Sequence, residues 1–381
     1  AKYRTFLQQG GIQVTVISST RHTPYSGMLP GYLAGHYTFD DIHLDVGQLV
    51  RFCGGRFLHA TATKITYNKN LIYIDDDRPP IRYDVLSIDI GSAPSAAPSS
   101  ASITPVKPIA NFCDSYNQIL EQFRKFKEDC FEVAVVGGGA GGVELALALH
   151  HRLSKFKKPF RVHVITRQGL MGSHPPAVGR ILDRVMKERG IQVYSNSQVN
   201  NVLQDNENGK KRLLFGNDTA SLEVDACFWC VTAAAAAWLN HDAPFATTEE
   251  SNFVRVKDTY ETIHHPGVFA VGDCCHMDQH PRPKAGVFAV RAGPILLQNL
   301  VRYLSNQPLI RHRPQKLFLQ LISTGDKYAI ATRGRFVTLE GAWLWMIKDW
   351  IDRKWMAKYS TELPDLEEMM ANMKHTSKKT L

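Results

Sequence analysis

Apolar and β-branched residues cluster in short stretches along the first hundred positions of the chain. Turn-forming residues bound each stretch, which is typical of strands. The predicted strands cover residues 13–18, 56–67, 71–75 and 82–90. Between them, residues 21–31 are rich in turn formers and predict a loop, and the Ser- and Ala-rich residues 92–102 predict a surface linker.

The middle of the chain predicts a β–α–β unit. Residues 131–136 form an apolar run, residues 143–156 have helical periodicity, and residues 161–166 form a second apolar run. This order is the signature of a parallel sheet with crossover helices. The same patterns predict further helices at 115–128 and 178–189, strands at 191–194 and 224–232, and a polar hairpin around 206–216.

A helix rich in tryptophan is predicted from Gly341 to Tyr359. Apolar residues fall on one side of it at helical spacing, and charged residues fill much of the other side. The apolar set is Trp343, Met346, Ile347, Trp350, Ile351 and Trp355, and the charged set is Lys348, Asp349, Asp352, Arg353 and Lys358. Such a helix is suited to a lipid interface, and packing on another domain or on a second copy of the chain is the alternative.

A G-x-G-x-x-G pattern lies between the predicted strand and helix of the β–α–β unit, at Gly137, Gly139 and Gly142. The first glycine permits a tight turn, the second lets the backbone approach a pyrophosphate, and the third allows close packing of helix and strand. The start of the helix then offers free N–H groups to the phosphates. We therefore expect a dinucleotide site here, with a glycine turn that binds no ligand as the alternative.

The residues at the end of the strand 161–166 help to decide between NAD and NADP. NAD sites usually place Asp or Glu there to hold the ribose 2′-hydroxyl, whereas this chain has Thr166 and Arg167. These residues suit a 2′-phosphate, so we expect NADPH to be used at least as well as NADH. Glu144, just inside the helix, is either stabilised by the helix dipole or placed near the nicotinamide.

Composition narrows the classes of function. The chain has 381 residues, enough for two or three domains, and 44% of them are hydrophobic, as in globular proteins. The net charge of +9 suits either an anionic partner or a plain solvated surface. Nucleic acid is not expected, since no helix-turn-helix, zinc-knuckle or RNP-like pattern is present. No run of about 18 apolar residues predicts a membrane-spanning helix, and the histidines lack metal-ligand spacing.

Seven cysteines, an odd number in a long chain, favour a reducing, intracellular setting over a disulfide scaffold. Cys227 and Cys230 form a CxxC on a predicted strand, where residues three apart face opposite sides. Their Cα atoms would lie roughly 10 Å apart, too far for a disulfide. Cys274 and Cys275 are adjacent, which predicts packing rather than redox chemistry.

Residues 268–273 (VFAVGD) resemble the second flavin fingerprint of flavoproteins with two dinucleotide-binding domains. The resemblance implies that Gly272 and Asp273 hold the ribityl chain of FAD. It further implies that residues 283–289, with Gly286, form the helix start that faces the flavin pyrimidine. Residues 82–94, with Gly91 and Ser92, resemble the strand and crossover that precede an inserted nucleotide domain.

The order of these elements is similar to the type II NADH dehydrogenase and sulfide:quinone oxidoreductase superfamily. Residues 22–31 (HTPYSGMLPG) and 318–333 are similar to its subgroup found alone or fused to selenide, water dikinase. The resemblance implies an α/β fold of two Rossmann-like, three-layer domains with a C-terminal helical extension. The expected ranges are 1–108 and 255–325 for the FAD domain, 109–254 for the NAD(P)H domain, and 326–381 for the C-terminal segment.

The sequence departs from this pattern in three ways. The family's first strand and glycine loop, for the FAD pyrophosphate, have no counterpart, because residues 1–9 already look like the end of a helix. This leaves organelle targeting unjudged. Ala233 stands where the family often has Gly, which matters only if the glycine has a positive φ. No cysteine pair lies near the expected flavin face, so a dithiol relay is not expected.

The resemblance implies an oxidoreductase that uses FAD and NAD(P)H and passes electrons to a quinone or another acceptor. The cofactors carry that chemistry and the protein positions them. Lys284 is a candidate for stabilising the reduced flavin, with a plain exposed lysine as the alternative. The competing hypothesis is a non-catalytic nucleotide-binding partner linked to selenophosphate synthesis. Both hypotheses allow an intracellular location, in the cytoplasm or at a membrane surface.

Overall fold

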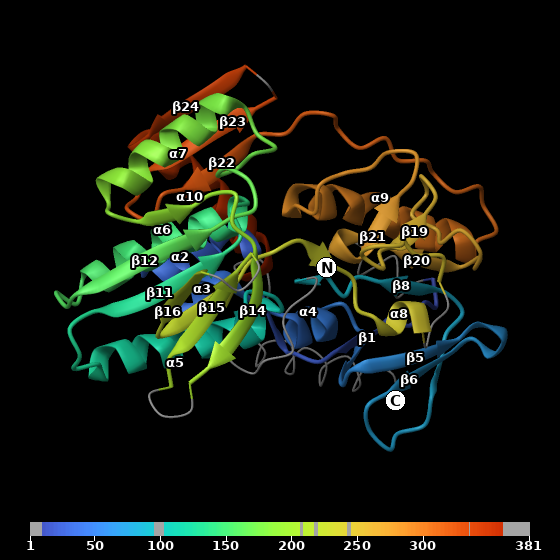
Figure 1. The fold of residues 1–381 in the computed structure, drawn as a ribbon. Helices are drawn as coiled ribbons and strands as arrows, with labels where there is room; N and C mark the ends of the chain where they lie inside the picture. Colours follow the sequence, from blue (N-terminus) through green and yellow to red (C-terminus); the bar gives the residue numbers. More distant parts are fainter. Residues whose placement is uncertain are drawn as a thin grey trace, which may run out of the picture.

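The computed structural model describes residues 10–94, 103–205, 209–216, 220–241, 245–334 and 336–360. The expected helix end at residues 1–9, most of the expected linker and the tip of the expected hairpin lie outside the described residues. Figure 1 shows two lobes side by side, one built around a parallel sheet and the other around helix α9 and several short strands.

The first lobe contains the predicted β–α–β unit. Its five strands are all parallel, in the order β10, β17, β11, β12, β13. They span Thr104–Pro105, Ala226–Trp229, Phe131–Val136, Phe160–Ile165 and Gln192–Tyr194, and the helices α5, α6 and α7 span Ile109–Lys125, Ala140–Ser154 and Pro176–Glu188. Central strand β11 is apolar apart from Glu132, because both faces of the sheet are covered.

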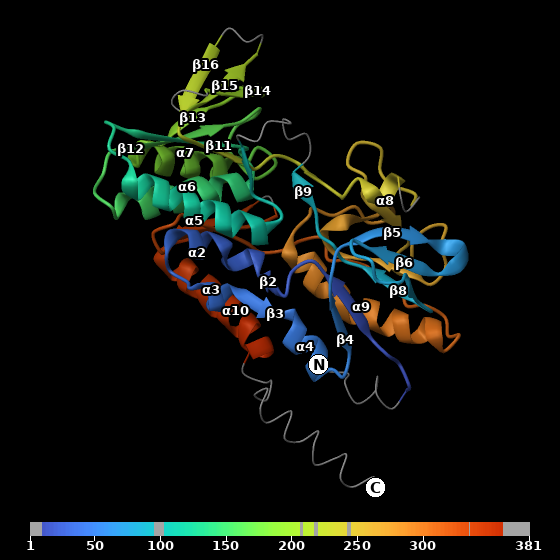
Figure 2. The same ribbon diagram turned by 90° about the horizontal axis from the view of Figure 1, so that it is seen from below.

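Two details of this lobe differ from the predictions. Helix α5 begins at Ile109, directly after Pro108, because its first turn buries Phe112 in the core beneath the sheet. The expected polar hairpin is part of a three-stranded antiparallel sheet that projects from the lobe (Figure 2). Its strands β14, β15 and β16 span Val199–Gln204, Lys211–Phe215 and Ala220–Val224.

The second lobe has a fragmented sheet. Strand β1 (Thr15–Ser18) pairs with β4 (Arg56–His59), and β8 (Leu86–Ile88) pairs with β20 (Val268–Ala270), both in parallel. Strand β19 (Val254–Val256) pairs in parallel with β21 (Cys275–Met277), and helix α9 (Gly286–Leu304) packs nearby. In the described part of the chain, no strand joins the β1–β4 pair to the β8–β20 pair.

Two predicted strands of this lobe are each divided. The stretch 56–67 forms β4 and then β5 (Ala62–Thr66), because the chain leaves its parallel partner β1 and pairs antiparallel with β6 (Leu71–Ile74). The stretch 82–90 is divided likewise between β7 (Ile81–Arg82), which pairs with β6, and β8, which pairs with β20. A change of partner between neighbouring strands leaves no trace in local periodicity.

Residues 22–52 do not belong to the second lobe alone. They form β2 (His22–Pro24), the turn η1 (Ser26–Met28), α2 (Leu29–Ala34), α3 (Phe39–Ile42), β3 (His43–Asp45) and α4 (Val46–Phe52). Helix α2 buries Leu29, Leu33 and Ala34 in the same core as α6 of the first lobe. The expected FAD-domain range therefore includes a segment that covers the nucleotide domain.

A C-terminal sheet also packs on the first lobe (Figure 1). Its antiparallel strands are β22 (Gln320–Ser323), β23 (Ala329–Arg333) and β24 (Val337–Gly341), and helix α10 (Ala342–Ser360) follows. Arg184 of α7 pairs with Glu340 at 2.5 Å, and Arg189 pairs with Asp326 at 2.7 Å. The sheet begins inside the range expected for the FAD domain, because β22 pairs with β23.

We predict that Gly325→Ala destabilises the docking of this sheet on α6. Gly325 has φ +88°, and an added Cβ would lie 2.5 Å from the carbonyl oxygen of Leu147 in α6. Gly209→Ala is a matched control, since Gly209 has φ +70° with nothing within 4 Å. The control should cost about 1–2 kcal/mol from backbone strain alone, and Gly325→Ala should exceed it by at least about 1 kcal/mol from the clash. Urea unfolding measures both, and equal losses would contradict the packing argument.

Candidate functional site

The glycine loop joins the carboxyl end of β11 to the start of α6. The positive end of the α6 dipole therefore lies at the loop. Gly137 has φ +129°, and a Cβ there would lie 2.2 Å from the carbonyl oxygen of Cys230. A Cβ on Gly142 would lie 1.9 Å from the carbonyl oxygen of Gly137, so only glycine lets the helix approach this closely. Gly139, the N-cap of α6, has open space around it. This geometry is the one that a pyrophosphate cradle needs.

The expected ribose end lies next to this loop. Thr166, at the end of β12, is buried and lies against Gly138, whose added Cβ would meet the Thr166 hydroxyl at 2.4 Å. Arg167 follows it and is exposed. The structure thus brings Thr166 and Arg167 to the edge of the glycine loop, where Arg167 is free to reach an anionic group.

Two segments connect the lobes beside the loop. Strand β9 (Ala93–Pro94) leaves the second lobe and pairs antiparallel with β18 (Ala233–Ala234), which returns to it. Gly91, with φ +69°, turns the chain into this crossing, and Ser92 follows. Ala233 is not among the residues with positive φ, so Ala serves there without strain.

Asp273 lies at the carboxyl end of β20, in the turn η3 (Gly272–Cys274). Gly272 has φ +68°, and a Cβ there would lie 2.2 Å from Oδ1 of Asp89, so a side chain is excluded. The structure places Ser92 at this turn, with its hydroxyl 3.4 Å from Oδ2 of Asp273. It also places Lys107 there, a residue that sequence reasoning missed because nothing local marks it.

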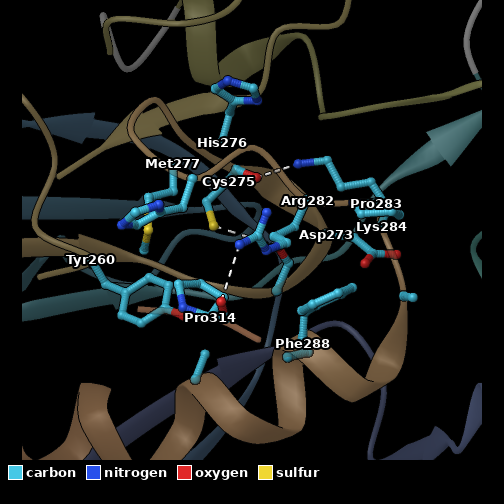
Figure 3. Close-up of a pocket in the computed structure, with 15 residues that line it drawn as sticks. Tyr260, Asp273, Cys275, His276, Met277, Arg282, Pro283, Lys284, Phe288 and Pro314 are labelled. Carbon is cyan, nitrogen blue, oxygen red and sulfur yellow. Dashed lines mark hydrogen bonds between the residues drawn. The ribbon is translucent and has the colours of Figure 1, made fainter. Parts of the chain in front are cut away.

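A small cavity of about 50 Å³ lies between η3, β21 and the first turns of α9 (Figure 3). Asp273, Lys284 and Phe288 line it, and Gly286 begins the helix at its edge. The ammonium of Lys284 donates to the carbonyl oxygen of Cys275 and lies 3.7 Å from the centre of the Phe253 ring. Burial lowers the pKa of Lys284. Lys284 is thus a partly buried lysine held by protein groups, and its role toward a flavin stays a prediction.

The C-terminal segment packs against helix α6, which the glycine loop precedes. Glu144, in the second turn of α6, accepts a hydrogen bond from the backbone N–H of Ser323 at 2.8 Å, which is not the first-turn position that a helix-dipole role requires. Burial raises the pKa of Glu144 to about 7, with the charge of Lys348 opposing the shift. Lys348 of α10 pairs with Asp352 at 2.6 Å and donates to the carbonyl oxygen of Gly27 in η1.

Helix α10 buries a pair of charged residues and exposes several large apolar residues. The polar pair Lys348 and Asp352 points inward, and Asp352 is only 5% exposed. The apolar side points outward and consists of Trp343, Met346, Ile347, Trp350 and Ile351, which are 52%, 66%, 39%, 60% and 41% exposed. The sixth residue of the predicted apolar set, Trp355, packs on the cluster around Tyr37 and Met356. Contact of the five exposed residues with a membrane or with a second copy of the chain stays a prediction. Among the described helices, none is long and apolar enough to cross a bilayer.

All seven cysteines are free. Cys227 packs with Trp229 above the parallel sheet, whereas Cys230 packs against the core on the other side, as the strand periodicity predicts. Cys274 and Cys275 are buried, and burial raises the pKa of Cys275 to about 12. Burial likewise raises the pKa of Cys227, Cys230 and Cys274, whereas a redox-active cysteine has a lowered thiol pKa.

The residues present suit the pyrophosphate of a nicotinamide nucleotide at the glycine loop and one end of a flavin at the Gly272–Asp273 turn. The glycine loop supplies a complete pyrophosphate cradle, and the Gly272–Asp273 turn with the start of α9 suits the ribityl and ring end of a flavin. A second strand–glycine loop–helix unit, for a flavin pyrophosphate, does not occur within the described ranges.

The strand, glycine loop and helix of the first lobe define a dinucleotide-binding protein. The family model described as "Pyridine nucleotide-disulphide oxidoreductase" matches residues 2–293, and the chain belongs to this family. Members of the family are flavoprotein oxidoreductases that use FAD and NAD(P)H. This assignment confirms the expected fold class, enzyme class and cofactors.

Individual relatives are distant. Ferroptosis suppressor protein 1 of Xenopus laevis is 24% identical over 214 residues, which cover 55% of this chain and 54% of that protein. The type II NADH:quinone oxidoreductase of Haemophilus influenzae is 25% identical, over 60% of this chain and 58% of that protein. The chain thus spans little more than half the length of these relatives. None of the relatives named here supports the expected link to selenide, water dikinase.

Among solved structures, the fold is similar to that of sulfide:quinone oxidoreductase from the hyperthermophilic bacterium Aquifex aeolicus. The TM-score is 0.76 at 18% sequence identity, and the match covers 98% of this chain and 91% of that one. At this identity the likeness concerns the fold alone. It includes the C-terminal sheet and α10, which lie beyond the residues matched by the family model.

We predict that Glu144→Gln stabilises the protein at alkaline pH only. The folded pKa of Glu144, about 7, lies above its ordinary value of 4.5. The folded state therefore binds more protons between these values, and stability falls as pH rises through that window. Gln keeps the hydrogen bond from Ser323 without the buried charge. Thermal unfolding should match wild type at pH 4 and occur a few degrees higher at pH 8.

Glu223→Gln, on the exposed surface opposite Arg212, is the control and should track wild type at both pH values. An equal effect of Glu144→Gln at pH 4 and pH 8 would show that charge burial is not the cause.

Proposed function

We propose that the protein is a flavin-dependent NAD(P)H oxidoreductase that passes electrons to a quinone. One observation carries the proposal: contacts of Lys107 bring the Gly272–Asp273 turn close to the glycine loop. Lys107 pairs with Asp273 at 2.7 Å and also lies near Cys230, whose carbonyl packs against Gly137. This juxtaposition suits the transfer of a hydride from one dinucleotide to another, since both reactive ends would meet at the hinge.

The chain's residues would then divide the work by position. Gly137, Gly139, Gly142, Thr166 and Arg167 hold the NAD(P)H, and the side of the hinge with Gly91, Ser92, Gly272, Asp273 and Gly286 holds the flavin. Bound FAD supplies the capacity to accept a hydride and to release its electrons singly or in pairs. The protein's task is to align the two groups and to exclude water.

Glu144 is our candidate for handling the proton that quinone reduction requires. A carboxyl group whose pKa lies near the working pH both gives and takes a proton readily. Lys348, whose charge acts on Glu144, pairs with Asp352 in α10. The alternative, that Glu144 only anchors β22 through Ser323, predicts no effect of Glu144→Gln on the pH profile of turnover.

The exposed apolar residues of α10 favour a quinone as the electron acceptor. The inner face of the helix carries Lys348, and its outer face is an exposed strip of Trp, Met and Ile. Lys354 and Lys358 lie over the rings of Trp350 and Trp355, at 4.6 and 5.0 Å, as basic residues do at a lipid headgroup layer. A membrane surface would bring a lipid-soluble acceptor to the same helix. The two sequence relatives and the structural neighbour described above include quinone oxidoreductases by name.

The competing hypothesis is a non-catalytic nucleotide-binding partner. Bound flavin in the purified protein separates the two hypotheses, because a nucleotide-binding partner has no need of it.

We predict that the purified protein carries or takes up FAD and that NADPH bleaches its visible absorption anaerobically. NADPH should react at least as efficiently as NADH. Arg167→Glu should lower kcat/KM for NADPH about tenfold, and leave that for NADH nearly unchanged, because only NADPH carries the 2′-phosphate. Stopped-flow absorbance measures both reactions. Nucleotide binding without any flavin would favour the non-catalytic hypothesis, and a strong NADH preference would contradict the role of Arg167.

We predict that the protein floats with liposomes containing anionic lipid and that Trp350→Glu weakens this binding. Removing one interfacial Trp and adding a negative charge should lower partitioning at least about tenfold. Leu203→Glu is a matched control, because Leu203 is 47% exposed on β14, far from α10 in Figure 2. A dimer formed through this face would instead show as a change in oligomeric state, with no flotation of the wild type.

A further inference from the structure

Lys107 lies at the junction of the two lobes, between β10 and α5. Its ammonium nitrogen is 2.7 Å from Oδ2 of Asp273 and 3.1 Å from the hydroxyl oxygen of Ser92. Asp273 belongs to the second lobe, Ser92 to the outgoing crossing, and Lys107 to the start of the nucleotide domain. One side chain thus ties together three segments that are far apart in the sequence.

Asp273 lies next to a second acidic residue, so a cation beside it is needed to balance the charge. Asp89 lies beneath Gly272, and desolvation together with the charge of Asp273 raises the pKa of Asp89 to about 6. Two carboxyl groups therefore share this turn. Lys284, the other lysine nearby, is held by the Cys275 carbonyl and the Phe253 ring. In the described chain, Lys107 is the cation that forms an ion pair with Asp273.

This ion pair spans the hinge and does not lie within one lobe. The two crossings pair over only two residues each, in β9 and β18, so few backbone hydrogen bonds hold the chain at this point. Lys107 and Asp273 are partly shielded, with side-chain exposures of 32% and 21%, where a charge pair is screened less than at an open surface. Lys107 also lies close enough to Cys230, beside the glycine loop, to influence its thiol.

We propose that Lys107 is a positioning residue that latches Asp273 across the hinge, in the orientation in which its carboxylate meets the ribityl chain of a flavin. The inference rests on the proposed function for the identity of the ligand, but the latch itself is a property of this chain. Lys107 leaves Oδ1 of Asp273 available as an acceptor while its ammonium holds Oδ2. Loss of Lys107 would have two effects at once: the Asp273 carboxylate could turn away, and the lobe orientation would become looser.

The test is a double-mutant cycle of Lys107→Met and Asp273→Asn on FAD affinity, measured by flavin fluorescence in the full-length protein. Each single variant should weaken FAD binding about tenfold, since each removes a charged hydrogen bond. The double variant should be no weaker than either single variant, because both act through the same contact. Lys107→Arg should restore most of the affinity and the visible circular dichroism of bound FAD, which reports flavin orientation.

Lys210→Met is the matched control, since it removes another lysine of an ion pair, with Glu128, at 3.0 Å, remote from the hinge. It should leave FAD affinity and dichroism unchanged. Wild-type affinity in Lys107→Met, or losses that simply add in the double variant, would overturn the inference. So would a failure of Lys107→Arg to restore the dichroism.

The same cycle in thermal unfolding of flavin-free protein separates this inference from the proposed function. A wild-type protein that binds no FAD contradicts the proposed function. The latch then stands if the Lys107 and Asp273 effects on unfolding are coupled, and it is overturned if those effects are additive.

Discussion

The burial of helix α6 on nearly every side is the constraint on which the rest of the structure depends. Its residues from Val143 to Leu149 are almost all apolar, and those that face the core are 0–2% exposed. The parallel sheet covers one side, α2 a second and β22 a third. A helix that is apolar all round must be covered all round. Three segments from distant parts of the sequence are therefore drawn to one helix.

The position of α6 also fixes the site. Its first residues carry the glycine loop, because Gly142 can approach Gly137 only where the helix lies tight against β11. Its second turn carries Glu144, whose carboxyl group meets β22 only because Gly325 lets that sheet approach Leu147. The glycines at both contacts are thus parts of one packing arrangement, and the site inherits its geometry from the core.

The second lobe is held differently. Its described strands form short pairs and one three-stranded antiparallel sheet, and the residues suited to a flavin lie in turns at strand ends. Their placement depends on ion pairs and on glycines with positive φ, such as Gly272 and Gly91, more than on a continuous hydrogen-bonded ladder. The lobe orientation therefore depends on a few polar contacts at the hinge, among them that of Lys107 with Asp273.

The sequence by itself determined the local elements of the nucleotide domain. Its strand, glycine loop and helix are specified by residues adjacent in the chain, so periodicity and glycine spacing locate them. The VFAVGD fingerprint located Asp273 for the same reason. Only the tertiary structure decided that α2 and β22 cover α6, that Lys348 faces Glu144 and that Lys107 meets Asp273. These contacts join residues far apart in the sequence, and local patterns carry no information on such partners. The sequence also identified the exposed Trp, Met and Ile residues of α10, but only the tertiary structure showed that its inner side carries Leu344 and Met356 together with the Lys348–Asp352 pair.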